Sequence, residues 1–230
     1  IIEIVPKYKE YASLEDFCKN EGVNSELADF VQCGLFFNDK AEKRRLYLHQ
    51  YNALKEAAIN RKNIVVTTGT GSGKTECFLL PIFADLISES RTWDKTNRPR
   101  AMRAMILYPL NALAEDQMIR LRKALNGQGK GRALDWLDRC RGGNRFFFGR
   151  YTGSTPVSGR GDIAQENIRK ERKQLNEDWK AAQESAKQTG NSELLYHVPC
   201  MDSDSAEMWD RLSMQQNAPD ILITNYSMLN

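Results

Sequence analysis

"VVTTGTGSGKTECFLLPIF", Val65 to Phe83, places three glycines and a lysine between two apolar runs. The first run, NIVVTT at residues 63–68, is rich in β-branched residues and predicts a short buried strand. The segment after Lys74 takes up helical periodicity through Ser90. A loop that connects a strand to a helix N-terminus presents successive backbone N–H groups to an anion. The stretch therefore predicts a phosphate-binding loop.

The residue types in this loop match what a nucleotide phosphate chain requires. Glycines allow the curvature without a Cβ clash, a lysine reaches the β- and γ-phosphates, and a Ser or Thr hydroxyl ligates Mg²⁺. The chain supplies these parts in order as Gly69, Gly71, Gly73, Lys74 and Thr75. Thr68 departs from the general pattern, which has a glycine there. The alternative is a Gly-rich turn with a surface lysine, and it requires strand, glycines, Lys-Thr and helix to coincide by accident.

The composition favours a globular α/β domain. The chain has 230 residues, of which 41% are hydrophobic and 27% charged, and its apolar runs are too short to span a bilayer. Five scattered cysteines without a CxxC pair, and two histidines, argue against a zinc site or a disulfide framework, so we expect a cytoplasmic protein and no membrane partner. Because the chain begins with Ile and ends just after an expected strand, we expect it to be part of a longer protein.

The net charge of +3 is unevenly distributed. Between Arg120 and Arg150, nine Lys and Arg stand against two Asp. Such a run is usually a solvated basic face, and it becomes a candidate nucleic-acid surface where neighbouring motifs also bind phosphate. Both interpretations remain open for its arginines, namely Arg132, Arg139, Arg141 and Arg145.

Strands and helices alternate along most of the chain, which predicts a parallel sheet flanked by helices. Three further strands are expected, in AMILYP (104–109), NRFFFGRYTG (144–153) and PDILITNY (219–226), and helices in LYLHQYNALKEAAIN (46–60) and NALAEDQMIRLRKALN (111–126). Residues 1–40 predict a helical lead-in whose two helices are capped by Ser13 and Ser25. Residues 157–218 break the rhythm and predict a polar helical insertion within the domain 41–230.

Five stretches resemble, in the right order, the motifs of superfamily 2 helicases. TGTGSGKT resembles motif I, LYLHQ the Q motif, YPLNALAEDQ motif Ia, RYTGSTP motif Ib and DILITNYSML motif Ic. The residues of these motifs are most similar to those of the bacterial branch of YprA-like and mitomycin-repair helicases, which includes the DISARM and Druantia phage-defence helicases. The resemblance covers Leu46 to Leu229 apart from the insertion. It implies the first RecA-like P-loop NTPase domain of an ATP-driven motor on DNA, with ATP and Mg²⁺ as cofactors.

The resemblance also implies roles for single residues. Lys74 and Thr75 would be catalytic, Thr75 would hold Mg²⁺ through ATP, and Gln50 would read the adenine edge. The expected nucleotide-binding set is Gln50, Thr70, Gly71, Ser72, Gly73, Lys74, Thr75 and Glu76. The expected nucleic-acid set is Pro109, Asn111, Thr152, Gly153, Thr224 and Asn225. Asn111 and Thr224–Asn225 have a second interpretation as helix caps, which is compatible with the first.

The acidic motif that ATP hydrolysis requires does not occur in this sequence. Hydrolysis needs an acidic motif, in this family an apolar strand that ends in Asp-Glu beyond motif Ic, and no such strand occurs here. We therefore expect the 230 residues alone to be inactive. The expected partners are single-stranded or partly double-stranded DNA, a second RecA-like domain of the same chain and proteins of a defence system. The alternative is an ATP-responsive nucleic-acid-binding or scaffold module that does not hydrolyse ATP. The absence of an acceptor-site motif and the presence of LYLHQ and TNYSML argue against a second candidate, a P-loop kinase.

Overall fold

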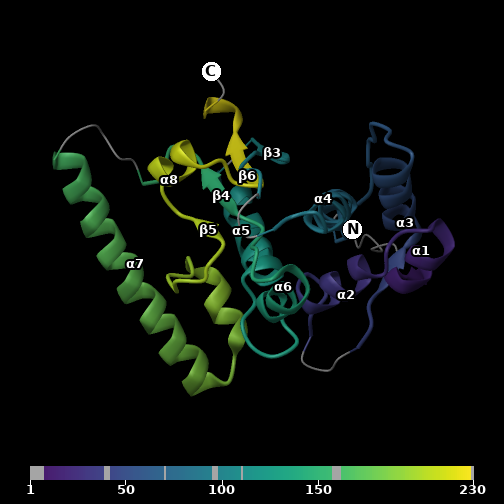
Figure 1. Ribbon diagram of the computed structural model, residues 1–230, viewed down its shortest axis with the longest axis horizontal. Coiled ribbons are helices and arrows are strands. Elements are labelled where there is room, and N and C mark those ends of the chain that lie inside the picture. The colour runs from purple at the N-terminus through teal and green to yellow at the C-terminus, as the bar shows by residue number, and fades with distance from the viewer. Residues whose placement is uncertain are drawn as a thin grey trace, which may run out of the picture. The chain divides into compact units, whose positions relative to one another are not determined.

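The computed structural model describes residues 8–38, 42–69, 71–94, 98–109, 111–156 and 162–228 (Figure 1). The chain divides into two compact units, Ile1–Thr92 and Trp93–Asn230. The lead-in boundary expected near residue 40 falls inside the first unit.

The first unit is mainly helical. Its elements are β1 (Glu10–Ser13), α1 (Leu14–Glu21), α2 (Glu26–Cys33), β2 (Arg45–Tyr47), α3 (Leu48–Leu54), a π-helix (Lys55–Ile59) and α4 (Lys74–Ser90). Ser13 caps α1 as expected, because its hydroxyl accepts from the Asp16 N–H at 3.0 Å and the Asp16 carboxylate accepts from the Ser13 N–H. Ser25 makes no such bond at the start of α2. The antiparallel pair of β1 and β2 was not expected.

The strand expected at residues 63–68 is wrong, because residues 61–69 form no strand. The side chain of Val65 is 90% exposed. A β-branched run becomes a strand only where a neighbouring strand pairs with its N–H and C=O groups, and none of the described strands does so here. The helix after the loop is confirmed with its expected bounds.

The second unit contains the parallel sheet. Its elements are β3 (Ala104–Tyr108), α5 (Asn111–Leu125), α6 (Ala133–Arg141), β4 (Phe148–Tyr151), α7 (Asp162–Thr189), a 3-10 helix (Ser192–His197), β5 (Glu207–Met208), α8 (Arg211–Gln216), β6 (Ile221–Asn225) and a 3-10 turn (Tyr226–Met228). The strand order is β3-β6-β4-β5 and all three pairings are parallel. The expected parallel sheet flanked by helices is confirmed, and so are its strands β3, β4 and β6.

The segment expected as an insertion contains the long polar helix α7 and also the short strand β5, which was not expected. The exposed side chains of α7 are mostly polar, but Trp179 is buried and its indole N–H donates to the Asp202 carboxylate at 3.0 Å. Met208 of β5 pairs with Gly149 of β4. The segment therefore adds an edge strand to the sheet.

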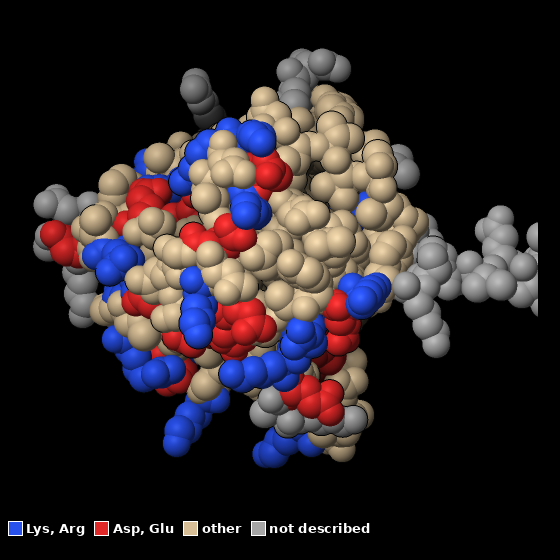
Figure 2. All heavy atoms as spheres, turned by 90° about the vertical axis from the view of Figure 1, so that its right-hand side faces the viewer, with Lys and Arg blue, Asp and Glu red and all other residues tan. Residues whose placement is uncertain are grey.

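Charge is mixed on the surface of the first unit. Its ion pairs include Lys43 with Glu15 at 2.9 Å and Lys62 with Glu56 at 2.7 Å. On the face shown in Figure 2, Lys and Arg side chains are interspersed with Asp and Glu, and no large area carries one sign of charge. A face of this kind is typical of a solvated surface rather than of a phosphate-binding one.

Candidate nucleotide and nucleic-acid sites

The phosphate loop curves as its glycines predict. Gly71 and Gly73 have φ angles of +73° and +74°, in the left-handed region that favours glycine. Helix α4 begins at Lys74, so its first N–H groups face the loop. The Lys74 ammonium donates to the carbonyl oxygens of Thr68 at 2.8 Å and Gly69 at 2.6 Å. The charge of Lys74 thus lies across the loop, within reach of any anion bound there.

Two side chains of α3 fasten that helix to the loop. The Gln50 amide donates to the Gly73 carbonyl at 3.0 Å, and its oxygen accepts from the Tyr47 N–H at 2.9 Å. His49 Nε2 donates to the Ser72 carbonyl at 2.8 Å. A Cβ on Gly73 would lie 2.3 Å from the Gln50 nitrogen, so Gly73 is also required by close packing. Gln50 therefore supports the phosphate loop, a contact that the sequence pattern did not predict.

The remaining loop residues lie as follows. Ser72 is buried and its hydroxyl lies 2.6 Å from that of Thr68. Glu76 is buried and pairs with Arg44 at 3.2 Å. Thr75, the second residue of α4, is partly exposed. Thr70 lies outside the described residues.

This arrangement fits ATP with Mg²⁺. The loop combines two glycines at positive φ, a helix N-terminus, a lysine and a hydroxyl. A groove of about 330 Å³ lies beside it, between α3, the π-helix and residues 64–68. Its volume falls within the range of small-molecule sites, roughly 300–1,000 Å³. A larger cavity of about 460 Å³ lies at the far end of α4, away from the loop.

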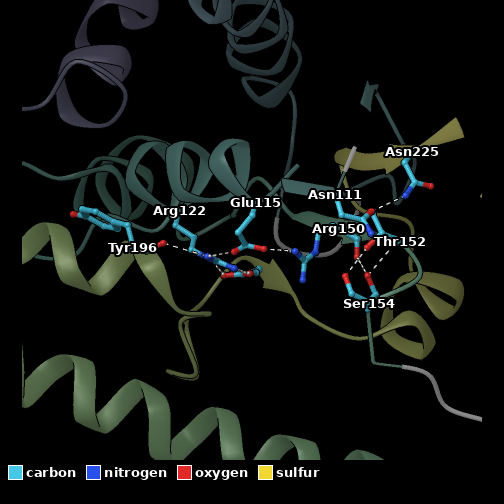
Figure 3. Close-up of polar contacts among 10 residues, drawn as sticks. Asn111, Glu115, Arg122, Arg150, Thr152, Ser154, Tyr196 and Asn225 are labelled. Atoms are coloured by element: carbon cyan, nitrogen blue, oxygen red, sulfur yellow. Dashed lines mark hydrogen bonds and ion pairs between the residues drawn. The ribbon is translucent and has the colours of Figure 1, made fainter. Parts of the chain in front are cut away.

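The nucleic-acid candidates meet at the carboxyl ends of β3, β4 and β6. The Asn225 amide donates to the Asn111 side-chain oxygen at 2.7 Å, and the Thr224 hydroxyl donates to the Tyr151 carbonyl at 2.7 Å (Figure 3). The Thr152 N–H donates to the Thr155 hydroxyl at 3.0 Å. Residues from three distant parts of the sequence therefore share one edge of the sheet, which is the usual location of ligand sites in parallel sheets.

These candidates divide by exposure. Pro109, Asn111 and Gly153 are exposed, whereas Thr152, Thr224 and Asn225 are buried. The buried side chains hold the loops together through the bonds just described. Ser154 was not predicted. It is exposed, and its hydroxyl lies 3.0 Å from that of Thr152. The only indication of Ser154 in the sequence was the content of Ser and Thr in the motif RYTGSTP.

A network of two arginines and two glutamates runs beside this edge (Figure 3). Arg122 and Glu207 are 4% and 2% exposed and are joined by hydrogen bonds of 2.8 to 3.1 Å. Glu115 accepts from Arg122 at 3.2 Å and also pairs with Arg150. Burial disfavours the charged form of Arg122, but the carboxylates of Glu207 and Glu115 outweigh it, and the pKa of Arg122 is raised. The four charges therefore compensate one another in place.

The basic stretch is largely engaged within the protein. Arg132 and Arg141 are buried, with Arg132 bound to the Tyr196 hydroxyl and Arg141 over the Trp136 ring. Arg139 pairs with Asp135 at 3.2 Å and Arg145 with Asp138 at 2.7 Å. Burial of Arg132 and Arg141, each 7% exposed, argues against a role of these two residues in following a nucleic-acid backbone.

Two further findings limit the kinds of site present. Among the described residues, no group of three or more His, Cys, Asp and Glu is placed to hold a metal ion. In the same part of the chain, no helix combines the length and the apolar character that crossing a bilayer would require.

Comparison with known proteins identifies the class. Residues 47–141 match the DEAD/DEAH box helicase family. The chain is 31% identical over 265 residues to the Druantia protein DruE of Escherichia coli (strain UMEA 4076-1), covering 99% of this chain and 14% of DruE. No solved structure matches the chain. The chain therefore carries a DEAD/DEAH box helicase region of superfamily 2.

Shorter alignments define its branch. The chain is 38% identical over 84 residues to the uncharacterized ATP-dependent helicase YprA of Bacillus subtilis (strain 168), covering 36% of this chain and 10% of YprA. It is 41% identical over 73 residues to the uncharacterized ATP-dependent helicase MJ1574 of Methanocaldococcus jannaschii, covering 32% of this chain and 9% of that protein. The chain is thus related to YprA and to DruE, and the expected branch is confirmed. It spans only a small part of the length of these relatives.

Proposed function

We propose that this chain is the nucleotide-binding first motor domain, at about residues 41–230, of an ATP-dependent DNA helicase or translocase. The observation that carries the proposal is the fastening of the phosphate loop, in which Gln50 holds Gly73 while Lys74 lies across the loop. The five motifs resemble those of a branch that includes phage-defence and mitomycin-repair helicases, and this resemblance supports a role in phage defence or DNA repair. The proposal places the protein in the cytoplasm.

Each residue has a definite task in this proposal. When bound, ATP with Mg²⁺ would supply the β–γ phosphoanhydride bond, whose hydrolysis by transfer of the γ-phosphoryl group to water would drive the motor. Lys74, which now donates to the Thr68 and Gly69 carbonyls, would hold the β- and γ-phosphates, and the Thr75 hydroxyl would hold Mg²⁺. In this structure Gln50 is 1% exposed and its amide is bonded to Gly73 and Tyr47, so reading the adenine edge would require its side chain to leave this buried position.

The edge formed by β3, β4 and β6 would grip one DNA strand through its sugar–phosphate backbone. Asn111 supplies a side chain there, and Pro109 and Gly153 an exposed backbone. Thr152, Thr224 and Asn225 hold these groups in position. Neutral donors suit a motor because they bind phosphate without reading the sequence.

The test is the ATPase activity of the full-length protein with and without DNA. We expect DNA to stimulate the wild type and Lys74→Ala to abolish turnover. Lys62→Ala is the matched control, because it removes an exposed lysine of the same unit that pairs with Glu56, and it should leave turnover unchanged.

Two other results would contradict the proposal. DNA binding that responds to ATP in a full-length protein without turnover would favour the scaffold module. Phosphate transfer to a small molecule or a protein would favour the kinase.

A further inference from the structure

Arg150 lies beside the proposed nucleic-acid edge with most of its hydrogen-bonding capacity unused. It belongs to the carboxyl-terminal half of β4, and Figure 3 shows its guanidinium between Glu115 and the Thr152 loop. Among the described residues, the only polar partner of this guanidinium is the Glu115 carboxylate. A guanidinium has five N–H donors, and so most of them are available to another acceptor.

The pair that holds Arg150 is accessible to solvent. The side chain of Arg150 is 24% exposed and that of Glu115 is 39% exposed. Ion pairs in such surroundings contribute little to stability, because water competes for both partners. Phosphate, by contrast, suits the planar fork of a guanidinium especially well. An incoming phosphate can therefore compete with Glu115 for Arg150.

The network also contains a second cation for the Glu115 carboxylate, which would lose Arg150 to the phosphate. Glu115 has a second cation, Arg122, at 3.2 Å, and Arg122 is fixed in place by Glu207. Removing one partner of an ion pair is costly when the other charge stays uncompensated. Since Glu115 would keep its bond to Arg122 and is 39% exposed to water, the release of Arg150 leaves a carboxylate that is still bonded and partly solvated, which lowers that cost.

We propose that Arg150 is a phosphate-binding residue for the nucleic-acid strand, and that Glu115 holds it in the free protein and competes with the strand for it. The inference rests on the proposed function, because it requires that the edge of β3, β4 and β6 bind nucleic acid. It adds to that edge a charged residue among its neutral ones.

The test measures binding of a fluorescent single-stranded DNA oligonucleotide to the full-length protein at several salt concentrations. Arg150→Gln should weaken binding about tenfold and lower the salt slope by about one, as the loss of a single phosphate contact does. Glu115→Gln should tighten binding about threefold, because it removes the competitor for Arg150. The two partners of one ion pair should thus have opposite effects. Arg61→Gln, which removes an exposed arginine of the first unit that pairs with Asp85 at 2.6 Å, is the control and should change neither quantity.

A pair with a purely structural role gives a different pattern. Both substitutions would then weaken binding, or neither would change it, and either result overturns the proposal. If Arg150→Gln fails to fold, the sign of the Glu115→Gln effect decides alone. Wild-type protein that binds no DNA overturns the proposed edge as well, whereas normal binding with an unchanged slope in Arg150→Gln overturns only the role of Arg150.

Discussion

Replacing Gly73 by alanine would test the packing of the phosphate loop against α3. The new Cβ would lie 2.3 Å from the Gln50 nitrogen and 2.9 Å from a Glu76 carboxylate oxygen. Gly71→Ala is a matched control, because Gly71 has nearly the same φ angle and its Cβ would meet nothing within 4 Å. The difference between the two variants therefore isolates the contact with Gln50 and Glu76 from the backbone strain.

The magnitudes follow from this geometry. An alanine held at positive φ costs about 1–2 kcal/mol, which is the whole effect expected for Gly71→Ala. Gly73→Ala adds about 1–3 kcal/mol for overpacking and roughly 0.5–1.5 kcal/mol for the displaced Gln50 hydrogen bond. We therefore expect Gly73→Ala to lower the free energy of unfolding by about 2.5–6.5 kcal/mol, against about 1–2 kcal/mol for Gly71→Ala.

Urea unfolding of the nucleotide-free protein is the appropriate assay, because bound ATP would add contacts of its own. Circular dichroism would follow all helices of the chain, among them α3 and α4. The reasoning is refuted if Gly73→Ala destabilises the protein no more than Gly71→Ala does.

Three further outcomes are expected. Gln50→Ala should relax the preference for ATP over GTP, measured by competition binding, and an unchanged preference would mean that adenine is read elsewhere. Arg122→Met should lower the free energy of unfolding by about 3–5 kcal/mol, because it leaves Glu207 buried without a cation; a loss below about 1 kcal/mol would contradict the buried pair. In the native protein at neutral pH, a thiol reagent should modify the exposed Cys140 fastest. Burial raises the pKa of three other thiols to about 11, and rapid modification of these three would contradict the fold. Those thiols are Cys18, Cys77 and Cys200.

The features that local chemistry determines could be predicted from the sequence. The glycines and the periodicity after Lys74 predicted both the loop and the bounds of α4, because backbone curvature and helix formation depend on nearby residues. The strand predicted from the β-branched run at 63–68 was wrong for the opposite reason, because a strand depends on a partner strand that its own residues do not specify. The two-residue strand β5 was too short to produce a periodic pattern.

The candidate sites show the same division. The motif positions predicted which residues gather at the edge of the sheet, but not that Thr152 and Thr224 are buried and hold the loops. The pair of Arg150 with Glu115 joins residues 35 positions apart, and that of Arg122 with Glu207 joins residues 85 positions apart. Such pairs are set by packing between elements, which a single sequence does not reveal.

The most direct test of the central claim is a calorimetric titration of the 230-residue chain with ATP and Mg²⁺, carried out in parallel on Lys74→Ala. We predict weak but measurable binding by the wild type, and binding at least about tenfold weaker in the variant, because a charge-assisted bond to phosphate is worth roughly 1.5–3 kcal/mol. Equal affinities in the two proteins would contradict the assignment of residues 69–75 as the phosphate loop.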